Sequence, residues 1–327
     1  MERASSRVGA PSRSANATRP DVLIDRIVEN LRLVVEAPDE TLELAVLCLV
    51  SEGHLIIEDF PGVGKTTLAK ALARSVGCSF SRVQFTPDLL PSDVTGVNMF
   101  SQQTNEFEFR PGPAFTNLLL VDEINRASPK TQSALLECMQ ELQVTVDGVS
   151  YELAQPYMVM ATQNPIEYEG TYPLPEAELD RFSLRLSIGY PPLEHEARMI
   201  DAQAQSDPLD ALTSVASAED VLNAIYEARA IFVEPSLSEY VVTLMQRTRV
   251  DRRLYLGASP RAGITLLRVA KARALATGRD HVTPHDVKAV APHVLSHRLI
   301  LAPEARASGI ETADLVRELV NGTPVPA

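Results

Sequence analysis

A glycine-rich stretch, "IIEDFPGVGKTT", comes close to the phosphate-binding pattern G-x-x-x-x-G-K-[ST]. In that pattern backbone N–H groups surround phosphate oxygens, the lysine contacts the β and γ phosphates, and the hydroxyl serves Mg²⁺. Gly64, Lys65 and Thr66 fit, whereas Asp59 stands where the first glycine belongs. The glycines that permit close approach to phosphate are Gly62 and Gly64, and aspartate tolerates turn conformations. We therefore predict a working nucleotide site.

The predicted site combines this loop with the N-terminus of the following helix, where N–H groups hold an anion. Thr66 and Asp122 are the expected Mg²⁺ ligands, because hydroxyl and carboxylate oxygens suit that ion. The residues expected to bind the nucleotide are Pro61, Gly62, Val63, Gly64, Lys65, Thr66, Thr67 and Asp122.

Two adjacent carboxylates follow the apolar run "NLLLV". Asp122 is expected to hold the Mg²⁺ shell, and Glu123 to orient and polarise the attacking water as a general base. Two such carboxylates in a loop can also be merely solvated. Their position directly after a buried strand favours the catalytic interpretation.

Three apolar runs predict the elements that position these groups, at residues 54–59, 117–123 and 157–165. Each is apolar throughout, as is typical of strands covered on both faces, and each ends in polar residues. In an open parallel sheet ligands bind at the carboxyl ends of the strands, so these endings should converge on one crevice. The fold class predicted is α/β, with a parallel sheet that is covered on both faces.

The character of the sequence changes near residues 189–194, after which helical spacing dominates. One helix is predicted to begin near Ser236, a second to be capped by Ser259 and stopped by Gly278, and a third to be capped by Thr283. A smaller all-helical domain is therefore expected.

The predicted organisation is a disordered segment at 1–20, an α/β nucleotide domain with N-terminal helices at 21–190 and a helical domain at 191–327. Within the α/β domain, "VTGVNMFSQQTNEFEFRPGPAF" resembles an insertion with a short hairpin. Asp147-Gly148 in "VTVDGVSYEL" is a strong signal for a second hairpin.

Composition narrows the function classes. The chain has 327 residues, 45% of them hydrophobic, and a net charge of −13. It contains no run near the roughly 18 apolar residues that span a bilayer, and its first 20 residues lack a secretory signal, so a cytoplasmic protein is expected. The acidic balance weakens a nucleic-acid interpretation. Cys48, Cys78 and Cys138 are too scattered for a metal or disulfide pattern and are expected to be core thiols.

Seven motifs together resemble the MoxR family of AAA+ ATPases over roughly residues 50 to 300. The resemblance implies an AAA+ nucleotide domain with three-layer αβα architecture, a helical lid and a homo-oligomeric ring, usually a hexamer, with ATP between subunits. It also implies a chaperone that matures protein clients, often with a partner containing a von Willebrand factor A domain. The motifs are "EDFPGVGKTTLAKALA", "QFTPDLLPSDVTG", "FRPGPAF", "LLLVDEINRASPKTQSALLECMQE", "MATQNP", "LPEAELDRF" and "GASPRA".

The resemblance gives roles to polar residues outside the loop. Asn164 resembles the sensor 1 residue, which touches the γ-phosphate and the water; otherwise it is a turn-forming asparagine. Arg261 opposes the dipole of the helix that it begins, a penalty that a nearby anion would reverse, and it resembles the sensor 2 arginine. Arg181 is the candidate arginine finger for a neighbouring subunit, the alternative being a local structural arginine. Arg126 is a weaker candidate for the same interface.

Ala37 and Pro38 depart from the family pattern, which puts the adenine contacts in doubt. Three function classes remain: a ring ATPase that remodels proteins, a nucleic-acid motor, loader or transcription activator on the same core, and a P-loop kinase or nucleotide switch. Glu123 beside Asp122 describes water activation, which disfavours the third class, and the acidic balance disfavours the second. The sequence therefore favours a Mg²⁺-dependent ATPase that acts on protein partners.

Overall fold

The structure, a computed structural model, describes residues 19–164, 171–190, 193, 196 and 208–325. The segment expected to be disordered lies almost entirely outside the described residues. The predicted boundary between domains falls where the description is interrupted, so it stays a prediction.

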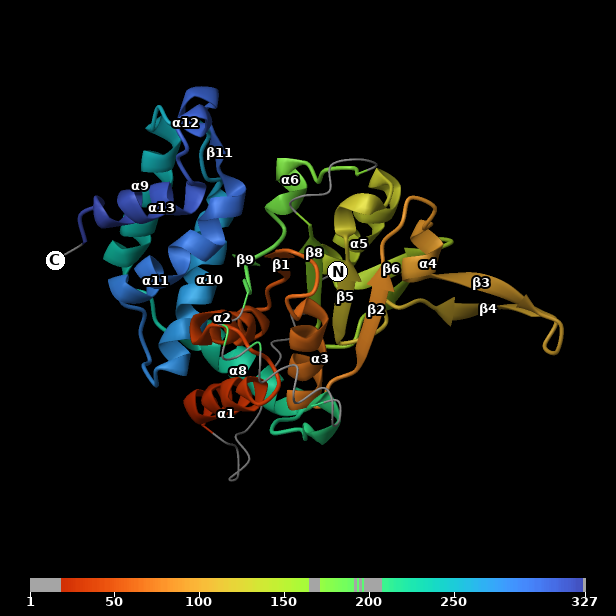
Figure 1. Ribbon diagram of the computed structural model, residues 1–327. Helices are drawn as coiled ribbons and strands as arrows, with labels where there is room; N and C mark the ends of the chain where they lie inside the picture. The colour runs from red at the N-terminus through yellow and green to blue at the C-terminus, as the bar shows by residue number, and fades with distance from the viewer. Residues whose placement is uncertain (1–18, 165–170, 191–192, 194–195, 197–207, 326–327) are drawn as a thin grey trace, which may run out of the picture.

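A five-stranded parallel sheet forms the centre of the nucleotide domain, in the order β2-β5-β8-β1-β9 (Figure 1). Three of the strands confirm the predicted apolar runs, while β2 and β9 were not predicted. The strands are β1 (Leu55–Glu58), β2 (Phe80–Gln84), β5 (Leu118–Asp122), β8 (Met158–Gln163) and β9 (Leu184–Leu186).

Side chains that alternate along these strands enter two different hydrophobic cores. Leu118 and Leu120 of β5 pack with the helices α1 (Pro20–Arg32), α2 (Asp39–Val50) and α3 (Lys65–Ser75). Leu119 and Val121 pack on the other face, with residues of α5 (Pro129–Glu141). Both faces of the sheet are therefore covered, which confirms the predicted three-layer αβα architecture.

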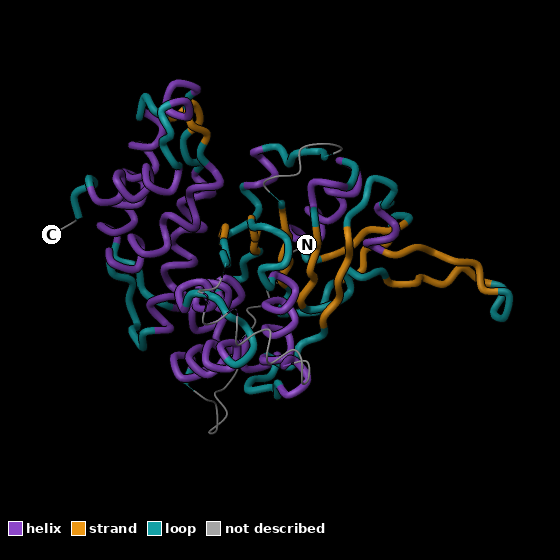
Figure 2. Tube along the Cα trace, viewed as in Figure 1, coloured by secondary structure: helices purple, strands orange, loops and turns teal. Residues whose placement is uncertain are grey.

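The C-terminal part is helical, as predicted (Figure 2). The Ser259 hydroxyl accepts from the Ala262 N–H at 3.1 Å and caps the helix that begins at Pro260. The first hydrophobic core continues from the sheet into these helices, so lid and core share buried surface. The helices are α8 (Ala218–Ala230), α9 (Pro235–Val250), α10 (Pro260–Ala276), α11 (Pro284–Leu295), α12 (Pro303–Ala307) and α13 (Thr312–Asn321), with the short strands β10 (Leu254–Leu256) and β11 (Ile300–Leu301).

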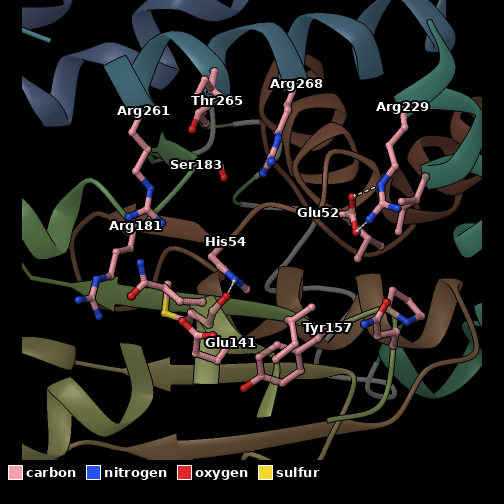
Figure 3. A pocket seen from close by; sticks show the side chains of 18 of the residues that line it. Glu52, His54, Glu141, Tyr157, Arg181, Ser183, Arg229, Arg261, Thr265 and Arg268 are labelled. Carbon is pink, nitrogen blue, oxygen red and sulfur yellow. Dashed lines mark hydrogen bonds and ion pairs between the residues drawn. The ribbon is translucent and has the colours of Figure 1, made fainter. Parts of the chain in front are cut away.

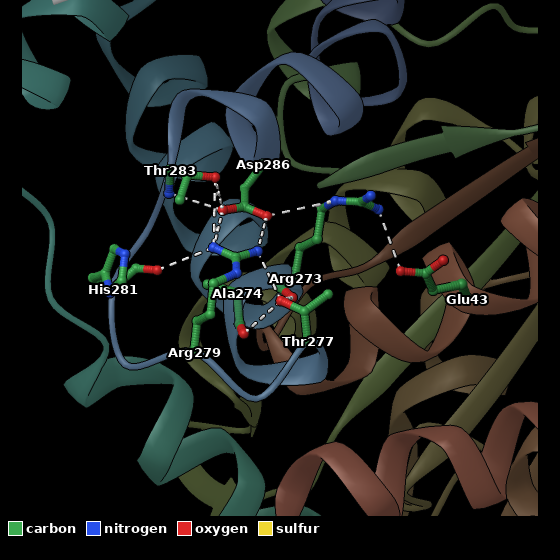
Figure 4. A network of polar contacts seen from close by, with 8 residues as sticks. All are labelled: Glu43, Arg273, Ala274, Thr277, Arg279, His281, Thr283 and Asp286. Atoms are coloured by element: carbon green, nitrogen blue, oxygen red, sulfur yellow. Dashed lines mark hydrogen bonds and ion pairs between the residues drawn. The ribbon is translucent and has the colours of Figure 1, made fainter. Parts of the chain in front are cut away.

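A polar network around Asp286 joins α10 to α11 (Figure 4). The buried Asp286 carboxylate accepts two hydrogen bonds of 2.7 Å from Arg279, and a third from the Thr283 hydroxyl at 2.7 Å. Arg273 bridges this carboxylate at 3.6 Å to Glu43 of α2 at 3.3 Å. The network thus ties the lid helices to the N-terminal helices.

Both predicted hairpins are present. The strands β3 (Gly96–Ser101) and β4 (Glu106–Pro111) project from the body of the molecule (Figure 1). The strands β6 (Gln143–Val146) and β7 (Val149–Glu152) are joined at Asp147 and Gly148, both of which have positive φ. The remaining elements are α4 (Pro91–Thr95), α6 (Glu176–Leu179), and the 3₁₀ turns η1 (Ile124–Arg126), η2 (Pro208–Ala211) and η3 (Ser296–Arg298).

The cysteines are free thiols. Cys48 and Cys138 are buried, as expected, whereas Cys78 is partly exposed at the edge of the first core.

Candidate active site

A cleft of about 330 Å³ lies at the carboxyl edge of the sheet, beside the glycine-rich loop. It brings together most of the residues expected to bind nucleotide or activate water. Val63 is the exception, because its side chain is buried in the first core instead. The cleft is lined by Pro61, Gly62, Gly64, Lys65, Thr66, Thr67, Arg82, Gln84, Asp122, Glu123, Thr162 and Asn164.

The loop is open toward this cleft because of its glycines. Gly62 and Gly64 have φ of +86° and +94°, and a Cβ added to either would meet nothing within 4 Å. The loop leads directly into α3, whose first residue is Lys65. The Lys65 ammonium donates to the Asp59 carbonyl oxygen at 2.6 Å. The backbone therefore forms an open cradle at a helix N-terminus, with a lysine beside it.

Asp122 and Glu123 are both fixed by Thr162 of β8. The Thr162 hydroxyl donates to Asp122 Oδ1 at 3.2 Å and accepts from the Glu123 N–H at 2.9 Å. Arg82 of β2 donates to Asp122 Oδ2 at 2.6 Å. Asn164, just beyond β8, is 9% exposed and lines the same cleft. Two donors thus orient the Asp122 carboxylate. The hydrogen bond from the Glu123 N–H to Thr162 fixes the backbone from which the Glu123 side chain extends.

Glu123 adopts left-handed backbone angles, φ 55° and ψ 54°, which are strained for a residue with a side chain. Its carboxylate accepts from the Arg126 guanidinium at 2.9 Å. Arg126, the weaker finger candidate, therefore contacts the catalytic candidate of its own subunit.

A second cleft, of about 460 Å³, lies at the amino edge of the sheet (Figure 3). Among its lining residues, His54, Tyr157 and Ser183 directly precede the strands β1, β8 and β9. Arg181 and Arg261 both line this cleft, Arg181 from the turn after α6 and Arg261 from the first turn of α10. Neither arginine lines the cleft that holds Lys65.

His54 and Gln140 are two of the uncharged residues that line the second cleft. His54 Nε2 donates to the Met139 carbonyl at 2.9 Å, and its Nδ1 accepts from the Val159 N–H at 3.1 Å. Burial lowers the pKa of His54 to about 4, so the imidazole is neutral near pH 7. With its amide oxygen facing Arg261, Gln140 accepts from that guanidinium at 3.0 and 3.1 Å. Arg181 and Arg261 therefore share this cleft with a neutral imidazole, and Arg261 has an amide acceptor beside it.

Comparisons with known proteins show which family the chain is similar to. Residues 54–184 match the ATPase family associated with various cellular activities (AAA), and residues 246–319 match the AAA lid domain. The uncharacterized protein YeaC of Bacillus subtilis is 48% identical over 304 residues, which span 93% of this chain and 95% of that protein. Chaperone MoxR1 of Mycobacterium tuberculosis is 39% identical over 97% of this chain and 86% of its own length.

The chain belongs to the MoxR family of AAA+ ATPases. A crystal structure of an ATPase candidate from Cytophaga hutchinsonii superposes on it with a TM-score of 0.87 and 38% identity, covering 94% of this chain and 96% of that one. The likeness includes the lid, so the relative placement of the two parts also has a solved counterpart. Within the described part of this MoxR-family chain, no helix is both long and apolar enough to cross a bilayer.

Three residues that line the MoxR-type cleft were not predicted from the sequence: Arg82, Gln84 and Thr162. Arg82 and Gln84 belong to β2, a strand that was not predicted. Thr162 lies within the predicted run 157–165, but its residue type gave no sign that its hydroxyl would contact both Asp122 and Glu123. Position at the carboxyl end of a parallel strand is the general signal that would have drawn attention to Gln84 and Thr162.

Proposed function

We propose that this MoxR-family protein hydrolyses Mg²⁺-ATP at sites formed between subunits of a ring and uses the energy to remodel partner proteins. The observation that carries the proposal is the separation of Lys65 and Glu123, at the carboxyl edge of the sheet, from Arg181 and Arg261, at its amino edge. Within one subunit, the cleft that holds Lys65 and Glu123 contains neither of these arginines. The cleft that holds Arg181 and Arg261, called the arginine cleft below, lies at the opposite edge of the sheet.

Binding of the triphosphate is supported by the open loop. The N–H groups at the start of α3 and the Lys65 ammonium provide charge-assisted hydrogen bonds to phosphate oxygens. Lys65 would exchange the Asp59 carbonyl, which it contacts at 2.6 Å, for the stronger anionic acceptor. The partial charge of the helix N-terminus adds to this attraction.

The donor set also fits Mg²⁺, which prefers oxygen ligands and retains several waters. Thr66 and Asp122 line one cleft, and Gly62 and Gly64 leave room beside them. Thr66 and Asp122 would hold the ion, Asp122 with its carboxylate oriented by Arg82 and Thr162. When bound, the ion would neutralise charge on the phosphates.

Glu123 is the proposed general base, and Asn164 would help to position the water that it activates. The Glu123 backbone is held by Thr162, and its side chain by Arg126. Release of this ion pair would free the carboxylate to accept a proton from water. Arg126 thereby acts in its own subunit in this proposal.

Arg181 and Arg261 are proposed to serve the ATP of the neighbouring subunit. A head-to-tail contact brings the amino edge of one sheet toward the carboxyl edge of the next, and repetition of such a contact closes a ring. Two guanidinium groups would then meet the γ-phosphate, where an arginine supplied in trans stabilises the charge of the transition state. A hexamer is the size that the family resemblance implies.

A protein client is favoured over nucleic acid. Chaperone MoxR1 bears that function in its name, and the net charge of this chain is −13, which opposes binding to phosphate backbones. A partner with a von Willebrand factor A domain and a cytoplasmic location remain part of the proposal. A filter-binding assay with single- and double-stranded DNA separates the two functions, since retention of DNA at physiological salt would favour the nucleic-acid alternative.

Replacement of Lys65 tests the nucleotide site. Lys65→Ala removes the charge-assisted phosphate contact, so the affinity for ATP should fall by about 100-fold or more. Lys70→Ala is the matched control, because Lys70 belongs to the same helix but does not line the cleft. Fluorescent-nucleotide titration measures both variants, and unchanged affinity in Lys65→Ala would reject the site.

A further inference from the structure

Asp59, the residue that departs from the usual phosphate-loop pattern, is 4% exposed and accepts four hydrogen bonds. Its Oδ2 accepts from the N–H groups of Ile188 at 2.6 Å and Gly189 at 2.7 Å, and from the Ser187 hydroxyl at 3.0 Å. Its Oδ1 accepts from the Phe60 N–H at 2.9 Å. The first residue of the loop is thus attached to a segment more than 120 positions away in the chain.

Only a carboxylate satisfies this arrangement. All four partners donate, and an ionised carboxylate is the one side-chain group of this size that accepts at both ends. An asparagine accepts at one end only, so its NH₂ group would face either the Phe60 N–H or the three donors that now bind Oδ2. A glycine, the usual residue, would leave the N–H groups of Ile188 and Gly189 without this acceptor. The departure from the pattern therefore has a physical function.

The attached segment begins at the end of β9, which pairs with β1 immediately before the loop. Phe60 extends the attachment, because its ring stacks on Tyr190 with centroids 5.6 Å apart and an interplanar angle of 18°. Two successive loop residues therefore hold residues 187–190.

The other end of β9 is held by the lid. The buried Arg298 guanidinium donates to Asp180 Oδ1 at 2.7 Å, and the Ser259 hydroxyl, which caps α10, donates to Asp180 Oδ2 at 3.1 Å. Arg181 is the next residue. The stretch 180–190 thus connects the phosphate loop at one end with the arginine cleft at the other.

We propose that Asp59 is a positioning residue that couples the phosphate loop to the stretch 180–190, and through it to the arginines offered to the neighbouring subunit. The inference rests on the proposed function of the two clefts. When phosphate draws Lys65 away from the Asp59 carbonyl, the loop changes its contacts at the residue that grips Ile188 and Gly189. The carboxylate transmits that change along β9.

Asp59→Ala tests this coupling, with Glu58→Ala as the matched control. Glu58 is the preceding acidic residue, and its ion pair with Arg185 at 2.9 Å is partly exposed, so its loss should change little. In Asp59→Ala the amides of Ile188 and Gly189 should exchange hydrogen at least about tenfold faster, and the KM for ATP should rise about tenfold, because these buried donors lose their acceptor. Glu58→Ala should stay within about twofold on both measures.

The decisive readout is the response to nucleotide. In the wild type, a non-hydrolysable ATP analogue should alter hydrogen exchange in residues 180–190, and Asp59→Ala should lose that response even at saturating analogue. If Asp59 had only a structural role, its substitution would change the hydrogen exchange measured without nucleotide but leave the response to the analogue intact. A wild-type KM and a wild-type response in the folded variant would overturn the proposal.

Asp59→Asn carries the test if Asp59→Ala does not fold. An amide accepts at one end only, so either the Phe60 N–H or the N–H groups of Ile188 and Gly189 lose their acceptor. Exchange of the amides that lose it should rise by about twofold to tenfold, the equivalent of one net hydrogen bond. Wild-type exchange at all three amides would contradict the assignment. If the wild type itself binds no nucleotide, the proposed function fails and the coupling fails with it, whereas loss of the Asp59 effect alone leaves the ATPase proposal standing.

Discussion

Glu123 has backbone strain where chemistry is expected. A non-glycine residue in the left-handed region costs on the order of 1–2 kcal/mol. The hydrogen bond from its N–H to Thr162 offsets part of this, and the geometry directs the carboxylate into the cleft rather than along β5. Backbone strain at Glu123 is consistent with a side chain that the fold holds in position for catalysis.

Glu123→Gln should bind ATP with nearly wild-type affinity and hydrolyse it at least about 100-fold more slowly, because the general base is lost while the phosphate contacts stay. Phosphate release under saturating ATP measures the rate, and nucleotide titration measures the affinity. Glu137→Gln, on the exposed face of α5, is the control and should retain full turnover. Wild-type turnover in Glu123→Gln would remove Glu123 from the mechanism.

The sequence predicted the cleft better than the side chains that support it. Lys65, Asp122, Glu123 and Asn164 were expected at one edge of a sheet and do line one cleft. The contacts that orient them come from residues whose types carry no catalytic signature, such as the Thr162 hydroxyl. The role of Asp59 was also missed, because its partners come from a distant segment that only the folded chain brings near.

At the scale of elements, the strands missed by the sequence analysis lie at the two edges of the sheet. Phe80–Gln84 has few buried side chains, so it lacks the apolar run that marked β1, β5 and β8. Leu184–Leu186 has three residues, too few for periodicity to register. Helices were easier to predict, because Ser259 and Thr283 cap them through local hydrogen bonds that depend on sequence alone.

The network between α10 and α11 should stabilise the lid. Asp286→Asn leaves the Arg279 guanidinium without its buried counter-charge, so the free energy of unfolding should fall by about 3 kcal/mol. Urea denaturation of the full chain measures the change. Asp314→Asn removes an exposed ion pair with Arg317 and should cost less than about 0.5 kcal/mol. Equal effects of the two variants would contradict the importance of the network.

The same carboxylate gives the lid a dependence on pH. Burial alone raises the pKa of Asp286, but the hydrogen bonds from Arg279 and Thr283 outweigh it and hold the pKa below 3.8. Because the pKa of Asp286 is lower in the folded state than in the unfolded state, its ionised carboxylate stabilises the fold, and this contribution is complete at pH values above the unfolded pKa. The contribution is therefore lost as pH falls through the folded pKa. Asp286→Asn should accordingly flatten the fall in stability below about pH 4.

At the scale of the whole molecule, the two clefts occupy opposite edges of one sheet. Strand direction fixes this separation, since the loop follows β1 whereas Arg181 precedes β9, and both strands run parallel. The sequence motifs identified Lys65, Glu123, Arg181 and Arg261 as candidates but did not predict that the arginines lie at the opposite edge of the sheet. An active site that used Lys65, Glu123 and both arginines would therefore need more than one subunit.

Mixing two inactive variants tests that requirement most directly. Arg181→Ala should bind ATP but hydrolyse it about 10³-fold to 10⁵-fold more slowly, and Lys65→Ala should not bind it. In rings mixed at equal ratio, about a quarter of interfaces would join an intact Lys65 cleft to an intact Arg181, so a comparable fraction of activity should return. Mixing Lys65→Ala with Glu123→Gln is the control, because both residues belong to one cleft and no complete site can form. Mixed assemblies that co-elute yet show no more activity than the separate variants would contradict the account.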